Sequence, residues 1–209
     1  MEYPLLFLDL ETTGHDPVRR IGDHLVPWHE IIDIGALFVD EKDLSIVGKF
    51  SEKVTPEHPE RCLPNLVNHY PERAARGEWD EAISLDAAIG QLFDFVRSYA
   101  AGTAAIPGGQ NWFFDWNFLS VAFAWCGVSE NTWKKHIHYT RFDTRSMAIQ
   151  ELLRPGEGYD PDAFSLRNGR LLERLGIPPE PEVHEGLNGA LKSFEIYKKL
   201  RELRALRDS

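Results

Sequence analysis

Phe7-Leu8-Asp9-Leu10-Glu11-Thr12-Thr13-Gly14 is the stretch that decides the fold, because it sets two carboxylates in an apolar strand. The apolar run from Leu5 to Leu10, bounded by a proline and by Thr-Thr-Gly, predicts a buried strand. Asp9 and Glu11 are two residues apart, so their side chains point to the same face. A buried strand has little reason to carry two carboxylates on one face unless a cation neutralises them. The pair therefore predicts a divalent-cation site, with a solvated acidic pair at the strand end as the alternative.

Further strands are predicted along the chain. Residues 31–39 and 44–54 are apolar runs separated by the short polar turn 40–43, which predicts a hairpin. The segment 15–30 has two prolines and mixed charge, so we expect a long loop that leaves the strand end carrying the two acids. Two later strands are predicted at 104–107 and 136–142.

Helices are predicted where apolar residues recur at spacings of three and four. They span Leu85–Tyr99, Asp115–Cys126, Thr144–Leu153, Ser165–Leu175 and, at the end, about Glu185–Leu203. The segment Thr55–Asn65 is rich in proline and charge and predicts irregular structure.

Composition limits the class of protein. A chain of 209 residues with 43% hydrophobic residues can bury a substantial core, and its length predicts one domain, residues 1–209. No signal peptide or membrane span is expected, and hence no membrane partner. Cys62 and Cys126 are the only cysteines, which favours a reducing, cytoplasmic compartment. The net charge of −10 argues against a broad basic face that coats nucleic acid, but not against a site where metal ions meet phosphate.

Three segments, in chain order, resemble the motifs of the DEDDh 3′→5′ exonucleases, a family that includes polymerase proofreading subunits, ribonuclease T and oligoribonucleases. Leu8 to Gly14 is similar to the first motif. Asn111-Trp112-Phe113-Phe114-Asp115 is similar to the second, which sets Asn and Asp four residues apart. His184, soon after Leu175-Gly176-Ile177, occupies the His position of the third. Five residues after that His the family has Asp, and this chain has Gly189.

The resemblance implies an α/β fold of the ribonuclease H-like type: a mixed five-stranded sheet with helices on both faces, its second strand antiparallel. It also implies two-metal hydrolysis at single-stranded DNA or RNA 3′ ends, with Mg²⁺ or Mn²⁺ as cofactor. A polymerase or a second copy of the chain is the implied protein partner. The implied catalytic residues are the general base His184 and the metal ligands Asp9, Glu11 and Asp115; the implied substrate contacts are Leu10, Thr12, Thr13, Gly14, Asn111 and Phe114.

Structural alternatives stand beside these assignments. Asp115 on its own would be a helix N-cap, and His184 a surface residue near a Pro-rich loop. The aromatic residues around Asp115 fit a core better than a platform for stacking bases. Gly189 removes one of four expected carboxylates, and Asn188, Glu185 or water are the candidates to replace it. That absence favours a rival hypothesis, a nucleic-acid-binding or polymerase-accessory module with the same fold and impaired catalysis. A phosphatase-like metal hydrolase is a third reading that does not account for His184.

Overall fold

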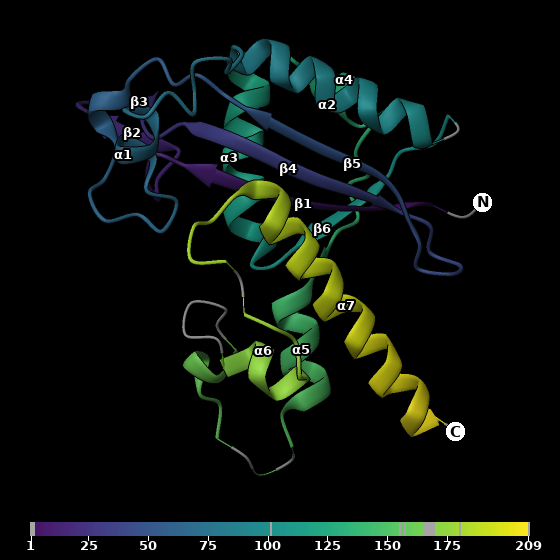
Figure 1. The fold of residues 1–209 in the computed structure, drawn as a ribbon. Helices are drawn as coiled ribbons and strands as arrows, with labels where there is room; N and C mark the ends of the chain where they lie inside the picture. The colour runs from purple at the N-terminus through teal and green to yellow at the C-terminus, as the bar shows by residue number, and fades with distance from the viewer. Residues whose placement is uncertain are drawn as a thin grey trace.

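The computed structural model describes residues 3–100, 102–154, 156, 158–164, 170–179 and 181–208 (Figure 1). Its main feature is a five-stranded sheet in the order β5-β4-β1-β6-β7. The strands are β1 (Leu5–Thr12), β4 (Ile31–Val39), β5 (Ile46–Lys53), β6 (Ile106–Gly109) and β7 (Phe142–Asp143). The helices are α1 (Tyr70–Ala74), α2 (Leu85–Tyr99), α3 (Trp112–Trp125), α4 (Glu130–Trp133), α5 (Thr144–Leu152), α6 (Arg170–Leu175) and α7 (Gly186–Asp208).

The sheet is mixed because one strand runs against the others. β4 pairs antiparallel with both β1 and β5, whereas β6 pairs parallel with β1 and β7 pairs parallel with β6. β4 is the second strand of this sheet along the chain, so the expected ribonuclease H-like arrangement is confirmed. All nine residues of β4 are buried, and all but Asp33 and Gly35 are apolar side chains that suit a central strand.

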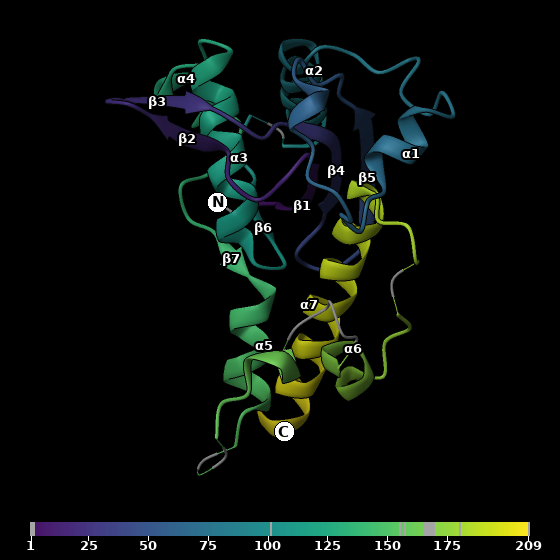
Figure 2. The same cartoon turned by 90° about the vertical axis from the view of Figure 1, so that its left-hand side faces the viewer.

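Helices cover both faces of the sheet, and the alternation along β1 explains how (Figures 1 and 2). Leu6, Leu8 and Leu10 point into a core that they share with α2 and α3. Leu5 and Phe7 point the other way and pack against α7. Farther along α7, a separate apolar cluster joins that helix to α5 and α6.

α2 has the bounds that its sequence predicts. Its buried face is made by apolar residues at helical spacing. The Ser84 hydroxyl accepts a hydrogen bond from the Ala87 N–H at 3.3 Å and so caps the first turn. α3, by contrast, begins at Trp112 and not at Asp115, so the reading of Asp115 as a plain N-cap is wrong.

Two other predictions need correction. The expected loop at 15–30 contains a two-stranded hairpin, β2 (Val18–Ile21) and β3 (His24–Pro27), that turns at Gly22 with φ 60°. β2 is exposed throughout, so its sequence has no alternation of apolar and polar residues from which a strand could be predicted. The expected strand at 136–142 is reduced to Phe142–Asp143 plus one bridge between Ala105 and Ile137. The turn that follows the short helix α4 runs through residue 136, and the N–H groups of His136 and Ile137 donate to the Trp133 carbonyl.

The remaining differences are at element ends. α7 extends to Asp208, five residues beyond the expected Leu203. The helix expected at 165–175 is described from Arg170 onward, and residues 165–169 lie outside the described part of the chain. The irregular segment 55–65 contains one 3₁₀ turn, Pro59–Arg61; a second 3₁₀ turn spans Pro161–Phe164. Within the described ranges, no helix combines the length and the apolar character that crossing a membrane requires.

Candidate active site at the end of β1

The two acids of the first motif lie on the sheet face that α7 covers. In the β1–β4 register, Asp9 pairs with Gly35 and Glu11 pairs with Asp33, so all four residues share that face. Asp9 is half-buried and Glu11 is buried. The pair therefore stands at the boundary between the core and the open end of the strand.

Glycines bring the start of α7 directly onto β1 and β4. A Cβ atom on Gly35 would overlap the backbone of Gly186, and one on Gly186 would overlap the backbone of Gly35. Residues without a side chain are the ones that permit this approach. One turn later, a Cβ atom on Gly189 would overlap the carboxylate of Asp9. The third-motif segment is thus in contact with the first-motif acid.

Asp115 reaches the same place from α3. Its side chain is 2% exposed, and its Oδ1 atom accepts a hydrogen bond from the Leu10 N–H at 3.0 Å. Burial raises the pKa of the Asp115 carboxyl well above its ordinary value; the bond from Leu10 opposes this, and the nearby carboxylates of Glu11 and Asp143 raise the pKa further. The first and second motifs therefore meet where the buried Asp115 carboxylate bonds the β1 backbone at Leu10.

The second motif begins with an unusual backbone conformation. Asn111 is left-handed, with φ 58° and ψ 45°, and makes no side-chain cap. Asp143, the N-cap residue of α5, caps α3 as well: its Oδ2 accepts from the Trp112 N–H at 2.7 Å. Its Oδ1 accepts from the Ser146 N–H of α5 at 2.6 Å. Phe114 is half-buried and packs against the core residue Phe118, with ring centroids 5.0 Å apart. Asn111 itself is exposed.

The Thr12-Thr13-Gly14 segment is buried and bonded within the chain. The Thr12 hydroxyl donates to the Gly14 carbonyl at 2.6 Å, and the Thr13 hydroxyl accepts from the Glu30 N–H at 2.9 Å. Gly14 packs against the ring of His29, which a Cβ atom would overlap. The side chain of Leu10 belongs to the core shared with α2 and α3. Any contact of these residues with substrate therefore involves mainly backbone.

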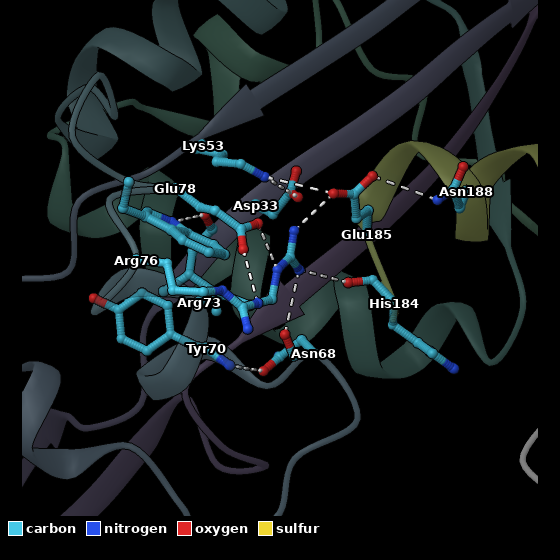
Figure 3. Close-up of polar contacts among 12 residues, drawn as sticks. Asp33, Lys53, Asn68, Tyr70, Arg73, Arg76, Glu78, His184, Glu185 and Asn188 are labelled. Carbon is cyan, nitrogen blue, oxygen red and sulfur yellow. Dashed lines mark hydrogen bonds and ion pairs between the residues drawn. The ribbon is translucent and has the colours of Figure 1, made fainter. Parts of the chain in front are cut away.

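Asp33 lies on the next strand, beside the start of α7. It is 2% exposed and lies 3.7 Å from the Lys53 ammonium. Burial raises the pKa of its carboxyl to about 6; Lys53 lowers it and Glu185 raises it. Figure 3 shows Asp33, Lys53 and Glu185 on one side of the His184 segment.

Two hollows lie near these elements. One of about 420 Å³ adjoins the second motif and is lined by Asn111, Phe113, Arg141 and Arg145 among others. A larger one of about 820 Å³ lies between the β2–β3 hairpin and α3, and none of the candidate acids lines it. The smaller hollow is not lined by these acids either, but Asn111 of the second motif lines it.

The structure brings the three predicted acids to one strand end without forming a closed metal cage. Among the described residues, no three His, Cys, Asp or Glu side chains lie in a group that could hold a metal ion. Carboxylate oxygens are nevertheless the ligands that divalent cations take in proteins, and Asp115 is buried beside the carboxylate of Glu11. The donors thus suit a divalent cation in kind, while Gly189 leaves the fourth position without a ligand.

Sequence reasoning missed Asp33, Asn68, Arg73 and Asp143. Asp33 had the same signal as Asp9, a carboxylate between isoleucines in an apolar strand. The other three lie outside the motifs, and nothing in their local sequence distinguishes them from solvated polar residues.

Comparison with solved structures shows what the fold resembles. The nuclease domain of 3′hExo, a DEDDh family member bound to rAMP, has a TM-score of 0.61 and 17% identity over 99% of this chain and 92% of its own. Escherichia coli Exonuclease I in complex with a dT13 oligonucleotide has a TM-score of 0.66 and 16% identity over 99% of this chain and 42% of its own. A 3′-exonuclease that recognises the 3′ end of the histone mRNA stem-loop has a TM-score of 0.66 and 17% identity, covering 97% of this chain and 64% of its own.

These similarities confirm, at the level of the fold, the resemblance to DEDDh exonucleases. This chain spans less than two thirds of the length of the second and third of these proteins. No protein-family model and no curated protein matches the sequence.

Proposed function

We propose that this chain is a metal-dependent 3′→5′ exonuclease that hydrolyses phosphodiester bonds at single-stranded nucleic-acid 3′ ends. The observation that carries the proposal is the hydrogen bond from the Leu10 N–H to Asp115 Oδ1, which holds the carboxylate of α3 at the strand that carries Asp9 and Glu11. A buried carboxylate beside other carboxylates is costly unless it serves a cation or a proton transfer. The similar exonuclease structures support the same reaction class.

Each proposed residue has a distinct role. Asp9, Glu11 and Asp115 would hold Mg²⁺ or Mn²⁺, and that cation supplies charge stabilisation for the attacking and leaving oxygens. His184 takes a proton from the attacking water. Asn111 and Phe114, at the start of α3, contact the terminal nucleotide.

The smaller hollow gives the substrate strand a path away from these residues. Arg141 and Arg145 line it and suit an anionic backbone, and Phe113 is 74% exposed and offers a face for stacking. This local basic lining makes strand binding compatible with a net charge of −10.

Hydrolysis of 5′-labelled single-stranded DNA and RNA in Mg²⁺ or Mn²⁺ tests the proposal. We expect products that shorten one nucleotide at a time from the 3′ end, and no products in EDTA. His184→Gln should lower kcat by about 10²–10⁴-fold, the usual contribution of a general base. Asp86→Asn is the matched control, because Asp86 is exposed on α2 and should leave the rate unchanged. Absence of hydrolysis with either metal would contradict the proposal.

A second candidate function is binding without hydrolysis. The observation that favours it is Gly189, which stands where a metal ligand is expected. This alternative predicts that the wild-type chain retains single-stranded oligonucleotides, measured by fluorescence anisotropy, while the hydrolysis assay stays negative. Slow but metal-dependent hydrolysis would instead favour the enzyme.

A further inference from the structure

A short segment, residues 66–73, connects the first motif with the third. Within it, Asn68 is 3% exposed, and its Nδ2 atom donates to Glu11 Oε2 and to the Thr12 carbonyl, each at 3.0 Å. Its Oδ1 atom accepts from the Tyr70 N–H at 3.2 Å. These bonds satisfy both ends of the amide. Asn68 therefore holds one acid and the backbone at the end of β1.

Arg73 forms the other half of the connection (Figure 3). Its Nη1 atom donates to the carbonyls of Asn68, at 3.3 Å, and His184, at 3.2 Å. Its Nη2 donates to Glu185 Oε1 at 2.7 Å, and its Nε donates to Glu78 Oε2 at 2.8 Å. In Figure 3 the His184 carbonyl faces the guanidinium, and the ring extends away from it. Arg73 thus holds the proposed base by its backbone carbonyl and not by its imidazole.

Because Arg73 is buried, its hydrogen bonds depend on the particular partners that surround it. Arg73 is 3% exposed, so its charge is removed from water and depends on Glu78 and Glu185 for compensation. The planar guanidinium directs its donors in fixed directions, which a lysine ammonium cannot reproduce. Because the same group bonds Asn68 and His184, movement of either end is transmitted to the other.

The Glu185 partner extends the connection into α7. Its carboxylate also lies 3.8 Å from Lys53 Nζ and accepts from Asn188 Nδ2 at 3.4 Å. Arg73 therefore contacts the residue that precedes the helix, and that residue contacts both β5 and the first turn of α7.

We propose that Arg73 is a positioning residue that sets His184 relative to Glu11, acting through its bonds to the His184 carbonyl, Glu185 and the backbone of Asn68. The role in hydrolysis rests on the proposed function, whereas the geometric role does not. Arg73 is too deeply buried to touch substrate, so its effect must pass through the residues that it holds.

Arg73→Lys tests the proposal, with Arg76→Lys as the matched control. Arg76 also bonds Glu78, at 3.0 Å, but its side chain is 66% exposed, and among the described residues it makes no hydrogen bond or ion pair with His184 or Glu185. The first readout is the histidine ring signals in a ¹H–¹³C NMR spectrum of the metal-free chain, with the His184 signal assigned from His184→Gln. We expect Arg73→Lys to move or broaden the His184 signal and Arg76→Lys to leave it in place.

The second readout is steady-state hydrolysis. We expect Arg73→Lys to lower kcat by about 10–100-fold, as a misplaced catalytic group does, with KM changed less than about twofold. If the wild type does not hydrolyse any substrate but the His184 signal still moves, the proposed function fails and the positioning role stands. An unmoved His184 signal in folded Arg73→Lys overturns the positioning role, whatever the activity.

Circular dichroism and thermal unfolding show whether Arg73→Lys is folded. If it is not, Glu185→Gln takes its place, because it keeps an acceptor for Arg73 but removes the charge. We expect the same change in the His184 signal at smaller amplitude. An unchanged signal in folded Glu185→Gln would then overturn the proposal.

Discussion

Gly189 of α7 lies against the carboxylate of Asp9, and that carboxylate fills the space that a side chain at position 189 would occupy. The missing acid of the third motif is therefore not a simple vacancy. The Asp9 side chain packs against α7 at Gly189, and a larger residue at position 189 would displace it. A fourth carboxylate can be restored here only if the Asp9 side chain rotates away.

Gly189→Asp should consequently destabilise the metal-free chain. The new side chain overlaps Asp9 and also adds a second negative charge beside it. We expect the free energy of unfolding to fall by about 1–3 kcal/mol, the usual cost of overpacking. Thermal unfolding in EDTA measures this as a lower Tm than that of the wild type.

Asn188→Asp is the control for charge, because it adds a carboxylate one residue away, about 100° around the helix. Its Tm should fall less than that of Gly189→Asp. Adding Mn²⁺ should raise the Tm of Gly189→Asp more than that of the wild type, since a cation relieves the paired carboxylates. Equal Mn²⁺ effects in the two proteins would contradict a metal site at Asp9.

Asp115→Asn should separate stability from activity. The amide oxygen can still accept from the Leu10 N–H, while the buried charge and its repulsion from Glu11 and Asp143 disappear. We expect the free energy of unfolding of the metal-free variant to rise by on the order of 1 kcal/mol at neutral pH, and the variant to be inactive in hydrolysis. Urea unfolding and the oligonucleotide assay measure the two effects.

Asp115→Leu is the comparison, because it also removes the acceptor. The buried Leu10 N–H is then left without a partner, at a cost of about 1–3 kcal/mol. If Asn were as destabilising as Leu, the carboxylate charge itself would be stabilising, contrary to the raised pKa of Asp115.

The central fold could be predicted because its signals are local. Leu85–Tyr99 and Ile31–Val39 have apolar patterns of the right length and period, and both elements have the predicted bounds. The spacing of Asp9 and Glu11 also fixed their common face before any tertiary contact was known. The order of the motifs also predicted that Asp115 lies near the strand that carries these two acids.

The supporting residues could not be predicted because their partners are distant. Arg73 contacts His184 and Glu185 from more than one hundred positions away, and no local pattern encodes that contact. The β2–β3 hairpin was missed for the opposite reason, since exposed strands lack an apolar period. The close contact between Gly35 and Gly186 could not be predicted either, because it depends on how α7 packs against β4.

Asp33 predicts a specific pH dependence of stability. Burial raises the pKa of its carboxyl from 3.8 to about 6, so the folded chain binds this proton more tightly than the unfolded chain. The resulting stabilisation is present below about pH 4 and is lost as the pH rises through about 6. Its size is on the order of 1–3 kcal/mol. Asp33→Asn should remove this loss while keeping a polar side chain of nearly the same size.

Urea unfolding in EDTA from pH 4 to pH 7 provides the measurement. The free energy of unfolding of Asp33→Asn, relative to that of the wild type, should rise between pH 4 and 6 and then level off. Asp86→Asn, at an exposed position, should differ from the wild type by a nearly constant amount. A pH-independent difference for Asp33→Asn would mean that Lys53 fully offsets the burial of the carboxylate.

Gly35→Ala should separate α7 from the sheet at the candidate site. The added methyl group overlaps backbone at Gly186, which has no flexible side chain that can yield, so the first turn of the helix must shift. We expect the free energy of unfolding to fall by about 2 kcal/mol or more, and hydrolysis to fall with it because His184 moves away from Glu11. Gly90→Ala is the control: it lies in the interior of α2 with open space around it, so alanine should stabilise the helix by about 0.5–1 kcal/mol. Equal stability changes for the two variants would mean that the contact between Gly35 and Gly186 does not hold α7 in place.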